Sequence, residues 1–240
     1  MFTKLPRWVE VGGFWLASIA GAVNAIGLLG FQHQGVSHLT GISTLLGVSV
    51  VNLDVAESAH LLFIMVSFVL GAALSGVIID GAVLRLGRRY SVTLLMEAAL
   101  LLLAMLSLSR GSTAGHFLAA AACGLQNGMV STYSGAAIRT THVSGLFTDI
   151  GTMMGARLRG HPIDMRKARL FLLLILGFIL GGSVGAYSYH HLQFVALLIP
   201  AAGAIALAIV YWVYWFMSKS HESEVLYPTS ATSDKLGPEL

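Results

Sequence analysis

Long, nearly charge-free apolar runs recur along this chain and limit the folds that it can adopt. Hydrophobic residues make up 56% of the 240 residues and charged residues only 10%, against about 25% charged in an average soluble domain. A helix of roughly 20 apolar residues crosses the hydrocarbon core of a bilayer. The sequence therefore predicts an all-α integral membrane protein with six transmembrane crossings, at residues 11–30, 61–79, 91–108, 117–133, 170–187 and 194–217.

A ten-residue pattern occurs twice, about a hundred residues apart. The first copy, HLTGISTLLG, begins at His38, and the second, HVSGLFTDIG, begins at His142. A Gly-rich apolar stretch with an Asn precedes each copy, and a second echo follows, FVLGAALSG from Phe68 and FILGGSVGA from Phe178. The chain therefore contains two versions of one unit. Short, Gly-interrupted segments at matching places in two halves point to the binding site of a transporter.

The two motif segments, 41–52 and 145–155, are short for a crossing, since about 12 residues of helix span only ~18 Å. Lys and Arg concentrate on the cytoplasmic side of membrane proteins. If neither segment crosses, all 14 Lys and Arg residues except Arg110 lie on that side. If both cross, four of these cations move to the opposite side. The stronger charge bias predicts two re-entrant half-helices and cytoplasmic termini.

Each unit then holds three crossings, so the second unit must be inverted relative to the first, and the site lies near the midplane where the two meet. We expect a first repeat at 10–109 and a second at 113–217, flanked by a cytoplasmic N-terminus at 1–9 and a polar cytoplasmic tail at 218–240. The second repeat carries a local insertion in the basic loop after Arg157.

The half-helices are predicted to begin at hydroxyl residues, because Ser and Thr side chains accept from the free N–H groups of a first turn. The candidates are Ser37 or Thr40 in the first copy and Thr141 or Ser144 in the second. Each half-helix start carries a partial positive charge and unpaired donors. Two such starts meeting at the bilayer centre would favour an anionic or strongly polar solute.

The far ends of the two half-helices differ in charge. Arg157 and Arg159 suit the negative end of the second half-helix, whereas Asp54 does not suit the end of the first.

The candidate substrate-binding residues recur at matching positions, and each also has a structural explanation. The histidines could donate to a carbonyl, the threonines could hydrogen-bond back to their own helix, and the asparagines could join helices. Recurrence favours histidines that line the cavity, whose charge changes between about pH 5 and 8. The set is Asn24, His38, Thr40, Gly41, Thr44, Asn127, His142, Ser144, Gly145 and Thr148.

Two carboxylates stand outside the repeat symmetry. Asp149 and Glu97 are proton-coupling candidates, since intramembrane carboxylates often serve ion coupling, although Glu97 also suits an interfacial place or a structural pair. Arg139 could compensate Asp149 or contact an anionic solute. Close helix packing is predicted at Gly71, Gly76, Gly177, Gly181 and Gly185.

No enzyme signature is present: the sequence lacks HExxH, GxSxG, CxxC and the P-loop pattern. We expect no catalytic residue, no cofactor and no metal site, and Cys123 is expected to be an apolar filler. The net charge of +3 follows from the cytoplasmic bias and does not indicate a nucleic-acid partner. The expected partners are the lipid bilayer and a small polar or anionic solute.

The motif residues resemble a known family. SHLTGISTLLG after AGAVNA, followed by ACGLQNG and THVSGLFTDIG, is similar to the YoaK-like family of uncharacterised bacterial inner-membrane proteins over roughly residues 10–217. Family members typically read SH-x-TGN at the first motif, where this chain has Ile42 in place of Asn. Ser144 replaces a Thr of the second motif, and an Asp often stands at the position of Asn24. The resemblance implies a multi-pass protein of the bacterial inner (plasma) membrane, with transport as a candidate activity and no named substrate.

Three functions remain open from the sequence. The first is a secondary transporter that works by alternating access. The second is an aquaporin-like channel, an analogy of plan and not of sequence. The third is a non-transporting membrane factor, such as a scaffold.

Overall fold

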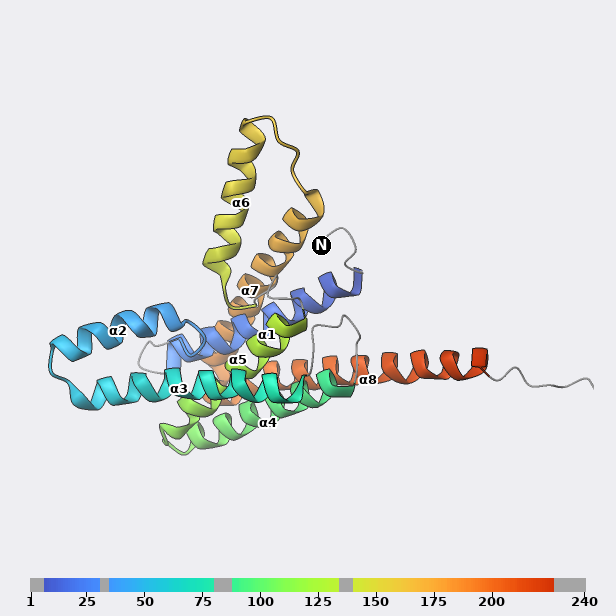
Figure 1. Cartoon of the computed structure of the whole chain (residues 1–240). Helices are drawn as coiled ribbons and strands as arrows, with labels where there is room; N and C mark the ends of the chain where they lie inside the picture. The colour runs from blue at the N-terminus through green and yellow to red at the C-terminus, as the bar shows by residue number, and fades with distance from the viewer. Residues whose placement is uncertain (1–6, 31–34, 80–87, 134–139, 227–240) are drawn as a thin grey trace, which may run out of the picture.

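The structure, a computed structural model, describes residues 7–30, 35–79, 88–133 and 140–226, and within them the chain forms helices only. Figure 1 shows a bundle from which α2 and α6 project. The all-α prediction is confirmed. The elements are α1 (Arg7–Gly30), α2 (Leu39–Val51), α3 (Val55–Ile78), α4 (Arg88–Ser109), α5 (Ala114–Tyr133), α6 (Val143–Leu158), α7 (Met165–Leu192), the 3₁₀ helix η2 (Gln193–Leu197) and α8 (Leu198–Leu226).

Four helical segments of the described chain are long and apolar enough to cross a bilayer. They are Glu10–Gly30, Val55–Ile78, Arg88–Ser109 and the 53-residue segment Met165–Met217. The last segment contains the last two crossings predicted from the sequence. α2 is a shorter apolar helix, in agreement with the short motif segment.

α5 is a predicted crossing that does not belong to this group of segments. Its sequence includes the polar residues His116, Gln126 and Asn127, which lower its hydropathy. In the structure α5 packs between α3 and α4, and these three side chains are buried. Polar side chains within membrane helices face the interior of the bundle, so α5 has a weaker hydropathy signal than a helix that faces lipid.

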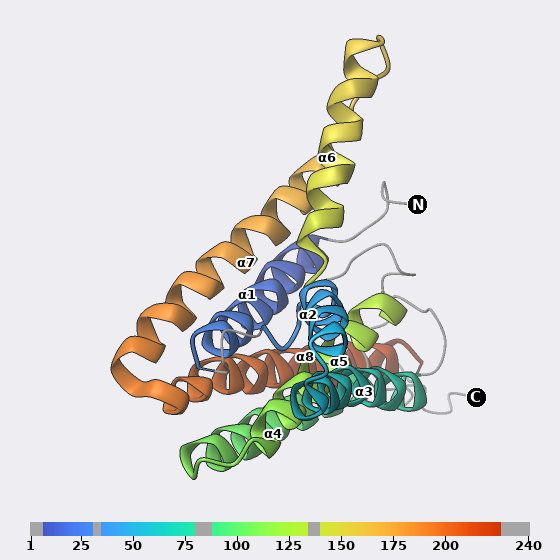
Figure 2. The same ribbon diagram turned by 90° about the vertical axis from the view of Figure 1, so that its left-hand side faces the viewer.

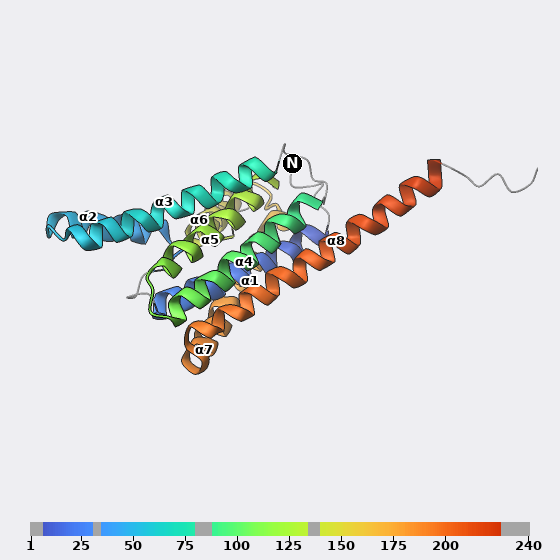
Figure 3. The same cartoon turned by 90° about the horizontal axis from the view of Figure 1, so that it is seen from below.

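The 53-residue segment is divided by the turn η2. Gln193 has a positive φ of 50°, and its backbone N–H donates to the carbonyl of Tyr189. Figure 3 shows α7 and α8 meeting in a sharp bend at this point. The segment therefore comprises α7, with 28 residues, and the first part of α8, whose full length is 29 residues, so it contains two helices, as predicted. α8 continues past residue 217, where we expected the polar tail to begin, and residues 227–240 lie outside the described part.

Glycines let helix backbones touch where α1 crosses α7 and where α3 crosses α5. A Cβ atom added at Gly71 would collide with the carbonyl of Ala121, and one at Gly181 with the carbonyl of Ser18. Gly177 and Gly185 show the same close approach to α1, each with a carbonyl oxygen at 2.6 Å from the added atom. Close packing is confirmed at these four glycines.

The prediction is wrong for Gly76, because a Cβ atom there would have no neighbour within 4 Å. This glycine is exposed on the side of α3 that faces no other helix. Sequence spacing alone does not distinguish the two sides of α3.

The crossing of α1 with α7 and the crossing of α5 with α3 use glycines at matching positions. In each crossing, a helix from one half of the chain packs on a helix from the other half. A Cβ atom at Gly21 of α1 would collide with the carbonyl of Phe178 in α7, and one at Gly124 of α5 with the carbonyl of Phe68 in α3. Gly21 and Gly124 each lie three residues before the Asn of their half, and the two phenylalanines begin the second echo. The first helix of each half thus packs on the helix that follows the motif of the other half.

Two clusters of buried side chains fill the bundle. One joins Ile26 at the end of α1 to Ala119 at the start of α5, and it includes Ile42 of α2. The other contains Met129 from the end of α5 and includes Leu146 of α6. α2 and α6 are therefore anchored in different clusters, at opposite ends of α5.

The glycine crossings lead to a test with a control on the same helix. We expect Gly71→Ala to lower the free energy of unfolding by about 1–3 kcal/mol, because the added methyl group overpacks the contact with α5. Gly76→Ala should be neutral or stabilising by up to ~1 kcal/mol, because alanine has the higher helix propensity. Thermal unfolding of the purified protein in detergent measures both changes, and equal effects would contradict the crossing.

Candidate functional site

The two motif helices, α2 and α6, begin directly after the motif histidines. His38 is the N-cap of α2, with φ −96° and ψ 67°, and His142 is the N-cap of α6, with φ −92° and ψ 55°. Neither histidine side chain makes a capping hydrogen bond. The prediction of hydroxyl N-caps is therefore wrong for all four candidates, Ser37, Thr40, Thr141 and Ser144.

Each histidine ring lies over the glycine three residues further along. A Cβ atom added at Gly41 would lie 3.1 Å from His38 Nδ1, and one at Gly145 would collide with the ring of His142. The motif glycines therefore leave room for the ring against the first turn. The atoms nearest to an added side chain thus belong to the histidine of the same motif.

The asparagines hold the loops that lead into the half-helices. Ser37 Oγ donates to Asn24 Oδ1 at 2.8 Å, and Asn127 Nδ2 donates to Thr141 Oγ1 at 2.7 Å. Ser37 and Thr141 occupy the same position, one residue before the histidine. These bonds explain why the two hydroxyls do not cap the helices, and they favour the structural role of the asparagines as a link between segments.

The second half has a larger network around its loop. Thr140 Oγ1 donates to Asn127 Oδ1 at 3.4 Å. Gln126 Nε2 donates both to the carbonyl of Leu16 in α1, at 2.7 Å, and to Thr140 Oγ1, at 3.2 Å. Sequence reasoning missed Ser37, Thr141, Thr140 and Gln126 as partners. The recurrence of a hydroxyl residue directly before each histidine was the available signal for two of them.

The motif threonines hydrogen-bond to their own helices. Thr44 Oγ1 donates to the carbonyl of Thr40, and Thr148 Oγ1 donates to the carbonyl of Ser144, both at 3.0 Å. All four side chains are exposed. The structural explanation for Thr44 and Thr148 is thus confirmed, and a contact with solute remains a prediction for the set.

α2 and α6 each bury one aliphatic side chain near the start and leave the motif histidine exposed. Ile42 of α2 and Leu146 of α6 are buried at matching positions, whereas His38 and His142 are exposed. Figures 1 and 2 show both helices starting near the centre of the molecule and running outward in different directions. Both helices thus start at the bundle and end away from it, and a meeting of the two starts remains a prediction.

An aspartate caps the helix that follows each motif. The sequence analysis did not recognise that these two aspartates occupy matching positions. Asp54 is the N-cap of α3 and accepts from the N–H of Glu57, and Asp164 is the N-cap of α7 and accepts from the N–H groups of Arg166 and Lys167. Each aspartate lies fourteen residues before the phenylalanine of the second echo. Asp54 therefore serves the positive end of α3, which explains its unfavourable place after α2.

The insertion in the second half is shared between helix and turn. α6 has 16 residues against 13 in α2, and the turn before Asp164 is also longer than that before Asp54. Both half-helices end with a residue of positive φ, Leu53 at 58° and Gly160 at 88°. Arg157 lies in the last turn of α6 and Arg159 is its C-cap, as predicted.

The two candidate carboxylates lie in different environments. Glu97 of α4 is only 2% exposed, and its Oε2 has no hydrogen-bond partner within the described residues. It lies close enough to Cys123 of α5 for an electrostatic interaction, and Cys123 is buried, as expected for a filler. Asp149 of α6 is partly exposed. Within the described residues, no hydrogen bond links Glu97 to Asp149. Arg139, the candidate partner of Asp149, lies outside the described part.

The structure also pairs two histidines that the sequence did not connect. His116 Nδ1 of α5 lies 3.0 Å from His60 Nε2 of α3, with their rings at 80°. Phe117 packs against His60 in the same place. Over the part of the chain that was searched, no group of three or more His, Cys, Asp or Glu residues could hold a metal ion.

The apolar helical segments, taken together, define a multi-pass membrane protein. Residues 12–210 match the family described as "Protein of unknown function (DUF1275)", and since this match spans most of the chain, the protein belongs to that family. Neither the curated proteins nor the solved structures contain a significant match. The family description confirms an uncharacterised family and carries no activity, so the YoaK-like label remains a resemblance.

The loop anchors make different numbers of bonds, which leads to a second test. Asn127→Ala should lower the melting temperature more than Asn24→Ala, because Asn127 contacts both Thr140 and Thr141. A double-mutant cycle between Asn24 and Ser37 should give a coupling of about 0.5–1.5 kcal/mol. Thr132→Ala is the control, since the hydroxyl of Thr132 donates within α5, to the carbonyl of Gly128. A loss in the control as large as that of Asn127→Ala would contradict the anchoring role.

Proposed function

We propose that this protein is a secondary transporter of a small polar or anionic solute, which binds at the starts of α2 and α6. The observation that carries the proposal is the recurrence of one local arrangement in both halves. In each half, an Asn hydrogen-bonds to the loop before the motif helix. The N-cap residue is a histidine whose side chain accepts no hydrogen bond from the first turn, and its ring lies over a Gly. A scaffold protein would not need the same arrangement in both halves. A solute site between the two halves would use one copy from each.

The chemistry of the helix starts selects the class of solute. The first N–H groups of an α-helix have no partner within the helix. In α2 these belong to Leu39, Thr40 and Gly41, and the N-cap side chain does not accept from them. α6 has the same uncapped start after His142. Two uncapped starts with positive dipole ends favour an anion or a solute rich in acceptors.

An inverted relation between the repeats is part of the proposal. It is supported by the exchanged glycine crossings, in which Gly21 meets α7 and Gly124 meets α3. It is also supported by the two buried clusters, which hold α2 and α6 at opposite ends of α5. In this arrangement α2 and α6 are re-entrant half-helices that enter from opposite sides of the bilayer.

The packing suggests how alternating access would work. α1, α6 and α7 pack together as one unit, and α2, α3 and α5 pack as another. Asn24 of the first unit bonds to the loop before α2, and Asn127 of the second bonds to the loop before α6. Relative motion of the two units would therefore shift each half-helix start against its anchor. Glu97 and Asp149 remain the proposed proton-coupling carboxylates.

The transport proposal is tested on the purified protein and in proteoliposomes. We expect thermal stabilisation by at least one member of a panel of phosphate, sulfate, small carboxylates, amino acids and nucleobases. Gly41→Val and Gly145→Val should abolish this stabilisation, and the double variant His38→Gln, His142→Gln should weaken it. Ser183→Ala, which removes a hydroxyl bonded to its own helix and lies outside the candidate set, is the control.

The outcome also separates transport from the alternatives. Uptake of the stabilising solute should saturate and exchange, whereas a channel would show flux that does not saturate. If both Gly→Val proteins respond to the panel as the parent does, or if only cations stabilise the parent, the proposed site is wrong and the scaffold function is favoured.

The inverted topology gives a separate prediction. Asn52→Cys, in the turn after α2, and His161→Cys, in the turn after α6, should react with a membrane-impermeant maleimide from opposite sides of the membrane. Both positions are exposed, whereas the native Cys123 is buried and should not react. With the proposed cytoplasmic termini, position 52 labels in intact cells and position 161 only in inverted vesicles. Labelling of both from one side would exclude the inverted repeat.

A further inference from the structure

Each hairpin that carries a motif helix is joined to the bundle by a polar contact between two helix starts. α3, of the hairpin α2–α3, packs on α5, and α7, of the hairpin α6–α7, packs on α1. Glu10 in the first turn of α1 forms an ion pair with Arg169 in the second turn of α7. His116 Nδ1 in the first turn of α5 lies 3.0 Å from His60 Nε2 in the second turn of α3. One hairpin is therefore joined by opposite charges and the other by two imidazoles.

α3 and α5 run parallel, so their starts lie side by side. The contact of His60 with His116 is followed, further along both helices, by the contact of Phe68 with Gly124. The start of an α-helix carries a partial positive charge. The imidazole pair therefore lies where two positive helix ends meet, and added positive charge is unfavourable at this place.

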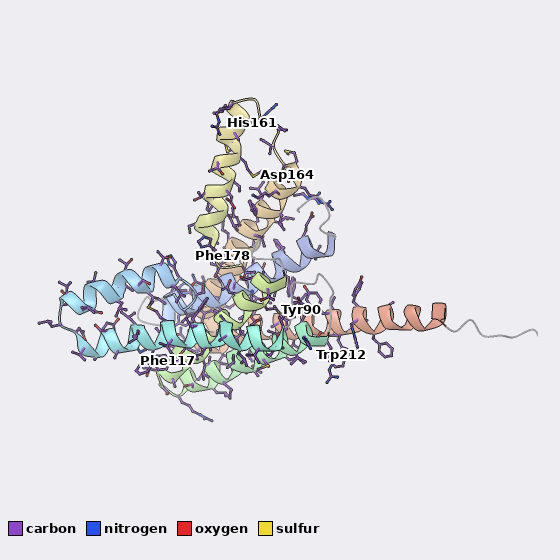
Figure 4. The ribbon with its side chains drawn as sticks, viewed as in Figure 1. Tyr90, Phe117, His161, Asp164, Phe178 and Trp212 are labelled. Carbon is purple, nitrogen blue, oxygen red and sulfur yellow. The ribbon has the colours of Figure 1, made fainter. Side chains whose placement is uncertain are left out.

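Aromatic side chains enclose the imidazole pair. His116 is 6% exposed, and the two imidazole rings are nearly perpendicular, at 80°. Phe117 packs against both His60 and Phe63. Figure 4 shows Phe117 beside α3 towards one end of the bundle, with Tyr90 towards the other. Burial and a neighbouring like charge both disfavour the charged form of an imidazole, so two charged rings are a poor fit to this place.

The described elements around the pair bring few titratable side chains. α2 has none. On α3, the carboxylates of Asp54 and Glu57 precede His60, and Asp54 caps the helix by accepting from the N–H of Glu57. Arg110 is an exposed cation in the turn between α4 and α5. The remaining groups lie further along α1, α4 and α5, and the nearest of them in the sequence are Glu10, Glu97 and Cys123. The first-turn carboxylates of α3 are thus the groups suited to offset one added proton at the pair.

The bond between the two rings tolerates one added proton and not two. A neutral pair has one hydrogen between the facing nitrogens, since one nitrogen donates and the other accepts. After one proton is added, the charged ring donates to the neutral ring, and the bond is kept. After a second is added, both facing nitrogens carry a hydrogen, so the bond is lost and two like charges lie side by side.

We propose that His60 and His116 form an acid-sensitive clasp, which holds the start of α3 on α5 and releases it when both rings are protonated. Release also affects α2, because α2 packs mainly on α3 and Ser49 of α2 is hydrogen-bonded to Ser58, two residues before His60. Protonation of buried histidines changes packing contacts in this way in pH-sensing proteins. The clasp depends on the packing of α3 on α5 and is independent of the proposed transport function.

The experiment follows thermal unfolding of the full-length protein in detergent between about pH 7.5 and about pH 4. His60→Gln keeps a side chain that can donate and accept but does not titrate. We expect acid to lower the melting temperature of the parent more than that of His60→Gln, because only the parent loses the bond. A double-mutant cycle between His60→Ala and His116→Ala should give a coupling of about fivefold in the unfolding constant near neutral pH, the equivalent of ~1 kcal/mol. At the acid end this coupling should vanish.

His161→Gln is the matched control, because it removes an exposed imidazole from the turn after α6. Figure 4 shows His161 at the far end of the α6–α7 hairpin, away from the bundle. This variant should follow the parent at every pH. The clasp is wrong if the parent and His60→Gln change alike with pH, if the coupling is the same at both ends of the range, or if His161→Gln has the same effect as His60→Gln. Should His116→Ala fail to fold, His60→Gln decides alone, since His60 is only partly buried.

Discussion

Direct contact between helix backbones at glycine is the interaction on which the rest of this structure depends. Lipid tails are as apolar as leucine, so membrane helices associate through close packing and not through a hydrophobic force between them. Here α1 meets α7 and α3 meets α5 with carbonyl oxygens against glycine Cα atoms. Each crossing joins the two halves of the chain. The crossings also place Asn24 and Asn127, which follow one turn after Gly21 and Gly124.

α2 and α6 are attached to the helices of these crossings by few contacts. α2 packs mainly on α3 and α6 mainly on α7, and each buries a single aliphatic side chain at a matching position, Ile42 and Leu146. The Asn–hydroxyl bonds then hold the loops at their starts. An apolar side held by the bundle leaves the histidine side exposed, so the same few contacts both attach the half-helix and present its polar residues.

The two halves share a backbone plan and differ in charge. Aspartate caps the helix after each motif, and a residue of positive φ ends each half-helix. Around this plan the first hairpin has carboxylates and the second has five cations between Arg157 and Arg169, with α6 and its turn both extended. Charge therefore distinguishes the two hairpins, and it is the basis of the proposed orientation in the membrane.

Sequence reasoning worked best where a residue's role follows from composition and spacing. The apolar runs predicted the helices, the repeated motif predicted two short helices, and the spacing of glycines predicted four of five close contacts. It failed where the role depends on a partner far away in the sequence. Gly76 has the same chemistry as Gly71 but faces no helix, and Ser37 and Thr141 have the chemistry of N-caps but bond to asparagines on other helices.

The sequence by itself determined that the chain crosses a membrane and that Asn, His and Gly recur together at two places in the chain. Hydropathy and repeated motifs can be read from the order of the residues, whatever the arrangement of the helices. Only the tertiary structure decided which helix each glycine touches, that each histidine ring rests on the glycine of its own motif, and that the asparagines bond to the hydroxyls one residue before the histidines. In each case several residues of the same chemistry could serve as the partner. The partner that is used is the one on the helix whose backbone approaches most closely.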